Sequence, residues 1–163
     1  MDAGLTLGEG PLDAEALKRA NVNPETGLAT DYLNHFNEAV MLIEMAGDMP
    51  DLAEEVLVWT PCSYEAHFEH TNYTGKDVAI AAWHAAPRDV RAHFETLIAV
   101  LNDTLGEAQE AVRGEDFTRA AEIASNDVEP LLAAARGCVN GRIEGEDADD
   151  SSAAQAGVDA LFG

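Results

Sequence analysis

The chain has 163 residues, 47% of them hydrophobic, and 31 acidic against 9 basic side chains, which gives a formal charge of -22. This length suits one domain with its own core, and the hydrophobic fraction excludes a wholly disordered chain. A surface this negative repels phosphate groups, so neither nucleic acid nor an anionic membrane is an expected partner. We expect a soluble cytoplasmic protein, because no apolar run approaches the roughly 20 residues of a transmembrane helix and the N-terminus lacks signal-peptide features. The acidic excess also fits a high-salt organism.

The first part of the chain is rich in turn-forming glycine and proline, and we interpret residues 1–27 as an N-terminal arm with one short helix over 13–20. Helical spacing of apolar residues begins after it. Thr30 is predicted to cap a helix that stops at Gly47. Shorter helices are expected over 50–58, over 63–70 with Ser63 as its cap, and over 77–86 with Asp77 as its cap.

The strongest helical signal lies in the second half of the chain. Apolar residues three and four apart predict one helix over 88–113 and another over 116–139, which should pack as an antiparallel hairpin. Pro130 should kink the second helix near Asn126, because proline lacks a backbone donor. Alternation with a period of two is nearly absent. The predicted fold class is therefore all-α, a bundle of four or more helices over 28–139.

The composition changes after the predicted hairpin. Residues 140–152 are acidic and contain glycine, which predicts a solvated linker. In residues 153–163, Val158, Leu161 and Phe162 are spaced i, i+3 and i+4, as in an amphipathic helix. A helix this short does not persist alone, so its apolar face must be buried by the bundle or by a partner.

The segment Gln155-Ala156-Gly157-Val158-Asp159-Ala160-Leu161-Phe162 resembles the receiver-binding peptide of the chemotaxis phosphatase CheZ and the flagellar switch protein FliM. The positions that fit that pattern are Gln155, Val158, Asp159, Leu161 and Phe162, whereas Ala154 replaces the usual serine. CheZ is likewise a helical bundle joined to its peptide by a flexible linker. The resemblance covers about nine residues of 163. It implies docking on a response-regulator receiver domain, and we hypothesise a non-catalytic interaction or regulatory protein.

A CheZ-like aspartyl-phosphate phosphatase is the first alternative. That chemistry needs an amide side chain that orients a water molecule beside the receiver's phosphate. Gln109 is the only glutamine outside the docking peptide, so it would carry this role. The family pattern Asp-x-x-x-Gln is not kept, because Leu105 stands four residues before it. Whether the chain is an enzyme therefore stays open at this point.

A metal- or small-molecule-binding bundle is the second alternative. His35, His67 and His70 are the candidate metal ligands, and the last two are spaced so that both could face one ion. No Glu-x-x-His spacing occurs, which disfavours a di-iron site, and no motif requires a cofactor. Cys62 precedes a predicted helix, whose start could lower the thiol pKa. Two questions stay open: whether the aromatic region 59–83 lines a pocket, and whether the chain forms a homodimer.

Overall fold

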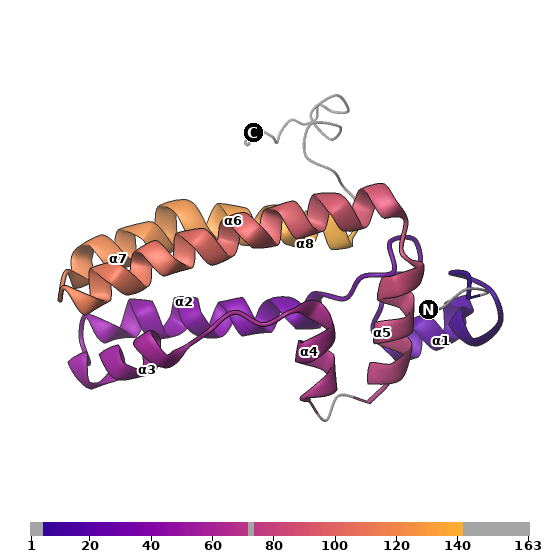
Figure 1. Ribbon diagram of the computed structural model, residues 1–163, viewed down its shortest axis with the longest axis horizontal. Helices are drawn as coiled ribbons and strands as arrows, with labels where there is room; N and C mark the ends of the chain where they lie inside the picture. The colour runs from indigo at the N-terminus through magenta and orange to yellow at the C-terminus, as the bar shows by residue number, and fades with distance from the viewer. Residues whose placement is uncertain (1–4, 72–73, 142–163) are drawn as a thin grey trace.

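The computed structural model describes residues 5–71 and 74–141, and within these ranges it is all-α, as predicted (Figure 1). No helix in this part of the chain is long and apolar enough to span a bilayer. The described chain ends at residue 141, two residues into the predicted linker. The rest of the linker and the whole predicted docking peptide lie outside the described residues. The elements are η1 (Gly10–Leu12), α1 (Ala14–Arg19), η2 (Thr30–Leu33), α2 (Asn34–Ala46), η3 (Pro50–Leu52), α3 (Ala53–Val58), α4 (Tyr64–Glu69), α5 (Lys76–Ala85), α6 (Arg88–Arg113), α7 (Phe117–Ile123), η4 (Ala124–Val128) and α8 (Glu129–Val139).

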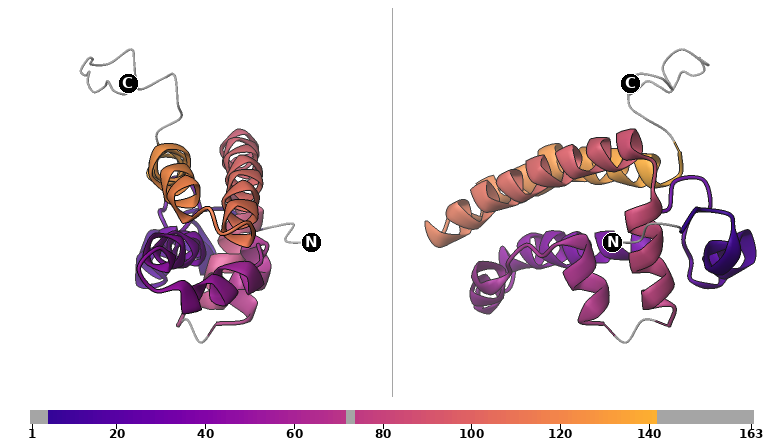
Figure 2. Two further views of the ribbon diagram at one scale, coloured as in Figure 1. Left: turned by 90° about the vertical axis from the view of Figure 1, so that its left-hand side faces the viewer. Right: turned by 45° about the vertical axis from the view of Figure 1, so that its right-hand side comes forward.

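The long helices form two layers. Helix α6 lies beside the run of α7, η4 and α8, and α2 and α3 lie beneath this pair (Figures 1 and 2). The predicted antiparallel hairpin is confirmed, because α6 contacts both α7 and α8 after a turn at residues 114–116. Helices α4 and α5 run across one end of the layers, and α1 packs against α5. The result is a packed helical bundle.

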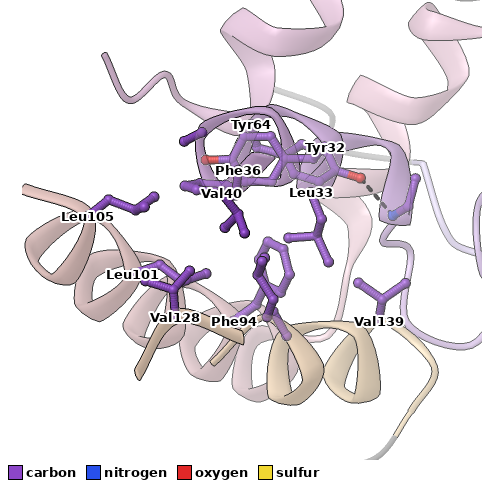
Figure 3. Close-up of a cluster of buried hydrophobic side chains, with 14 of the residues drawn as sticks. Tyr32, Leu33, Phe36, Val40, Tyr64, Phe94, Leu101, Leu105, Val128 and Val139 are labelled. Carbon is purple, nitrogen blue, oxygen red and sulfur yellow. Dashed lines mark hydrogen bonds between the residues drawn. The ribbon is translucent and has the colours of Figure 1, made fainter. Parts of the chain in front are cut away.

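The core lies between the two layers (Figure 3). Apolar side chains of α6 face those of η2 and α2, and all of them are at most 4% exposed. Burying a side chain of this size stabilises the fold by about 1.5–3 kcal/mol. The apolar residues of α6 therefore recur every three or four positions because one side of this helix packs on the layer beneath it. The side chains in this contact are Phe94, Leu101 and Leu105 above and Leu33, Phe36 and Val40 below.

The second helix of the hairpin is interrupted by a π-helical turn, η4. Pro130 follows it and has no amide hydrogen to donate to the carbonyl oxygen of Asn126. A π turn changes the local bonding pattern inside an otherwise continuous helix. A wider helical turn therefore lies where the kink near Asn126 was predicted, and the chain continues from it as α8.

Residues 5–27, the described part of the predicted arm, pack onto the body of the fold. The predicted short helix is α1, and the Asp13 side chain caps it by accepting a hydrogen bond from a backbone N–H. Leu17 on this helix is fully buried. The hydroxyl of Thr26 donates to the backbone oxygen of Val139 at 2.7 Å, which joins this segment to the end of α8. The apolar residues Leu12, Leu17, Ala20 and Val22 of this segment are thus part of the core.

Several helix starts differ from the predictions while others agree. Ser63 caps α4 as predicted, with its hydroxyl accepting a hydrogen bond from a backbone N–H. Thr30 does not act as a cap: it is the first residue of the 3-10 helix η2, which leads into α2. Asp77 lies inside the first turn of α5, whose cap is Gly75 at φ +91°. Glycine adopts this left-handed conformation without steric cost, so it sets the start of the helix.

Candidate functional site

The side chain of Gln109 binds the end of helix α3. Its Nε2 donates to the backbone oxygens of Val56 at 2.9 Å and of Trp59 at 2.8 Å. Both hydrogens of the amide nitrogen are used in these bonds. The Val56 oxygen also accepts from the Trp59 N–H at 3.3 Å, and Gln109, from the neighbouring α6, adds a donor to each of these two oxygens at the end of α3. The residue therefore has a structural role, and its action on a phosphoryl group stays a prediction.

The extended segment 59–62, which follows α3, is also bound by side chains of the lower layer. His35 Nε2 lies 2.7 Å from the backbone oxygen of Thr60, and because a carbonyl accepts, this nitrogen carries the proton. In return the Trp59 indole donates to the His35 backbone oxygen at 3.0 Å and stacks on the imidazole, with 4.7 Å between ring centroids. His35 therefore fixes this segment.

The third contact to segment 59–62 comes from η2. The hydroxyl of Tyr32 donates to the backbone oxygen of Cys62 at 2.7 Å. An extended segment without a strand partner has no backbone donors for its carbonyl groups, and these side chains supply them. We call Tyr32, His35 and Gln109 the clamp residues, because each binds a backbone oxygen in or next to segment 59–62.

The three candidate histidine ligands are not brought together around one point. His35 binds a backbone oxygen, whereas His67 Nε2 lies 2.9 Å from a carboxylate oxygen of Asp31. His70 is exposed at the end of α4. In the described part of the chain, no three His, Cys, Asp or Glu side chains form a group that could hold a metal ion. The described histidines mainly join neighbouring elements, as His67 joins α4 to η2.

A cleft of about 370 Å³ lies between the start of α4 and helix α6. Buried aromatic rings close its inner side: Tyr64 stacks on Trp83 at 4.3 Å, and Phe94 lies 6.2 Å from both rings. Tyr32 adds a fourth ring, 5.1 Å from Tyr64; it is labelled with Tyr64 and Phe94 in Figure 3. Tyr64 and Trp83 of the aromatic region 59–83 therefore line a pocket. The sequence had left open whether this region does so.

Helix α6 forms the opposite wall of the cleft. Glu95, Ile98 and Asn102 are spaced three and four apart and share one face of the helix, beside the stripe that enters the core. The Oδ1 atom of Asn102 is buried and has no hydrogen-bond partner among the described residues. Leaving a buried acceptor unpaired costs about 1–3 kcal/mol. Sequence reasoning missed Asn102, because a single asparagine on an amphipathic helix does not differ from an ordinary solvent-facing residue.

Two groups of the cleft keep their protons at neutral pH. Burial raises the pKa of the Cys62 thiol. Burial, and secondarily the nearby Cys62, raise the pKa of Tyr32 far above its ordinary range. A nucleophilic cysteine needs a lowered pKa. Burial therefore outweighs any effect of the start of α4 on Cys62, and this thiol stays protonated at neutral pH.

The charged side chains of the cleft are both carboxylates. Glu95 is exposed, and Glu65 is partly exposed with its oxygen 2.7 Å from His84 Nε2. Among the described residues that line the cleft there is no lysine, arginine or histidine. The cleft therefore combines an apolar interior with a negative entrance.

The docking-peptide residues lie outside the described residues, so the structure does not place them: Gln155, Val158, Asp159, Leu161 and Phe162. Comparisons with protein-family models, curated proteins and solved structures found no match to this chain. Functional conclusions therefore depend on the sequence pattern of the chain and on the geometry of its described residues.

Proposed function

We propose that this chain is a non-catalytic regulatory protein that docks on the receiver domain of a response regulator through residues 153–163. The apolar ridge of this segment would enter a hydrophobic groove of the receiver as one face of a short helix. The observation that carries the proposal is the receiver-binding pattern formed by Gln155, Val158, Asp159, Leu161 and Phe162.

The predicted linker over 140–152 adds a physical reason for this arrangement. A flexible random coil of this length has a root-mean-square end-to-end distance of about 20 Å. A docked peptide would then keep the helical body near the same receiver at an effective concentration on the order of millimolar. Even a weak contact made by the body would be occupied much of the time, which suits a regulatory protein.

The geometry of Gln109 supports the non-catalytic form of the proposal over the phosphatase. A phosphatase of the CheZ type would need this amide to face a water molecule on the receiver surface. Its nitrogen instead donates to the backbone oxygens of Val56 and Trp59. Releasing the amide for catalysis would break both bonds, so the side chain is poorly placed for that role.

Titration of the full chain into a panel of purified receiver domains from the source organism tests the proposal. Each receiver is used with and without beryllofluoride, which mimics the aspartyl phosphate, and binding is measured by calorimetry. We expect at least one receiver to bind. Leu161→Ala and Phe162→Ala should each weaken binding roughly tenfold to a hundredfold, because each removes a buried side chain worth about 1.5–3 kcal/mol.

Ala156→Ser is the matched control, since position 156 lies on the opposite side of a helix from Val158 and should leave the affinity unchanged. Failure of the whole panel to bind, or unchanged binding after deletion of residues 153–163, would overturn the proposal. Receiver dephosphorylation is measured in parallel. An acceleration that disappears in Gln109→Ala would favour the phosphatase instead.

A further inference from the structure

Helix α2 presents a row of methionine side chains to solvent. Met41 and Met45 lie one helical turn apart on one face of α2, and the Met49 N–H donates to the Met45 oxygen at 2.9 Å, so Met49 continues the row past the helix end. Their exposed fractions are 52%, 38% and 44%. We call these three residues the methionine row. Every methionine of the described chain belongs to it, although methionine is usually a core residue.

Acidic side chains flank the methionine row. At 3.6 residues per turn, Glu38 lies on one side of the row and Glu44 on the other, and both are exposed. Neither forms an ion pair with another described residue. The sequence has no lysine or arginine between Arg19 and Lys76, so this stretch contains no such cation to neutralise them.

An open hollow at the end of α2 continues this surface. Its apolar part comes from Phe117 and Ala121 of α7. Four exposed carboxylates line it and form no ion pair with the described residues: Asp48, Glu115, Asp116 and Glu122. Arg119 is close in sequence but does not line the hollow. A ring beside carboxylates suits a lysine or arginine, whose stem packs on the ring while its charged end meets an acidic group.

We propose that the methionine row and this hollow form a docking surface for a basic amphipathic helix of a partner protein. The apolar side of that helix packs on the methionine row, and its lysine or arginine side chains pair with the flanking carboxylates. The row is about 12 Å long, from eight residues at 1.5 Å each, which matches about two turns of a docked helix. Flexible methionine side chains adapt to the shape of such a partner.

Charge selects this occupant over the others. The charged groups described above for this surface are all carboxylates, so it favours a cationic segment. A second copy of the chain, with a formal charge of -22, would be repelled, and so would an acidic peptide. The proposal does not depend on receiver docking, because described residues of the helical body alone carry it.

The test uses three synthetic peptides of equal length. LKKLLKLLKKLLKL has a leucine face and lysine flanks, AKKAAKAAKKAAKA keeps the charge without the large apolar face, and LEELLELLEELLEL keeps the face and reverses the charge. Each is titrated into the full chain labelled with ¹³C at the methionine methyl groups, at one salt concentration at which circular dichroism shows the chain folded. The leucine–lysine peptide should bind at least tenfold more tightly than either of the others and should shift the methyl signals of the methionine row.

Variants of exposed residues locate the contact. Met41→Gln should weaken binding of the leucine–lysine peptide roughly threefold to tenfold, because about half of the methionine surface remains to be buried. Val100→Gln on α6, at an exposed residue outside the row, is the matched control and should bind as the parent chain does. Glu44→Gln and Glu122→Gln should each weaken binding up to about fivefold, whereas Glu107→Gln changes the charge equally and should have no effect.

Several outcomes would overturn the proposal. Equal binding of the two lysine peptides would show that only the net charge of the chain acts, and equal binding of the two leucine peptides would show that charge does not select the occupant. Sedimentation of the full chain checks for a second copy: a dimer that Met41→Gln converts to a monomer would assign the surface to self-association. Peptide binding that appears only after deletion of residues 153–163 would assign it to the chain's own C-terminal segment.

Discussion

The role of Gln109 as the partner of the α3 end gives a direct prediction for stability. Gln109→Met keeps the length of the side chain and removes both donors to the backbone oxygens of Val56 and Trp59. Each hydrogen bond contributes about 0.5–1.5 kcal/mol net, so the free energy of unfolding should fall by about 1–3 kcal/mol. For a small domain with a stability of about 5–15 kcal/mol, this is a substantial fraction.

Urea unfolding at fixed salt measures the effect. With a slope of about 2 kcal/mol per molar, the midpoint of the Gln109→Met variant should fall by about 1 M. Gln109→Glu should lose at least as much at neutral pH, because its carboxylate would face two carbonyl oxygens. Glu107→Gln, an exposed neighbour, should stay within about 0.5 kcal/mol of the parent chain. A loss below about 0.5 kcal/mol in Gln109→Met would refute the structural role and return the amide to the phosphatase hypothesis.

Four further predictions concern the backbone and burial. Thr26→Val should lose about 1–3 kcal/mol of unfolding free energy, because it leaves the buried oxygen of Val139 without its donor, while Thr26→Ser should stay near the parent. Gly106→Ala should stabilise α6 by about 0.5–1 kcal/mol, since no atom lies within 4 Å of the added Cβ. Gly75→Ala should instead cost about 1–2 kcal/mol, because its φ is +91° and the new Cβ would meet Ala20 at 2.9 Å. Burial raises the pKa of the Cys138 thiol from 9.0 to about 11, so the folded chain retains this proton after the unfolded chain has lost it. The free energy of unfolding should therefore fall as pH rises through this window, and less steeply in Cys138→Ala.

Chemical denaturation also checks these four predictions. Equal stability of the valine and serine variants at position 26 would contradict the hydrogen bond to Val139. A destabilised Gly106→Ala would mean that the open side of α6 is covered by something outside the described residues. For Cys138, the same pH slope in the parent and the alanine variant would show that its burial does not contribute.

The sequence predicted those elements whose structure depends on local spacing. Helix α6 extends over 26 residues at the predicted bounds because its apolar period continues without interruption and Pro87 and Gly114 enclose it. Local chemistry also predicted the cap at Ser63, because its hydroxyl binds an N–H only three residues away.

Features set by distant contacts could not be predicted in this way. The packing of residues 5–27 depends on a hydrogen bond from Thr26 to an oxygen 113 residues later in the chain. Helical spacing predicts which side of a helix His35 and His67 occupy. It does not predict that His35 binds a backbone oxygen or that His67 binds an aspartate from another element. The question of a pocket in the aromatic region stayed open for the same reason, because the rings of Tyr64 and Trp83 come together only in the folded chain.

The clamp residues connect the cleft to the rest of the molecule. The backbone of segment 59–62 runs into the cleft wall, and its oxygens are bound by side chains from η2, α2 and α6. These hydrogen bonds are already formed without a ligand, so ordering this wall should cost little conformational entropy on association. Occupancy and thermal stability are then thermodynamically linked: a ligand at a hundred times its dissociation constant would raise the unfolding free energy by about 2.7 kcal/mol. A rise of the melting temperature with ligand concentration would thus report binding to the folded chain.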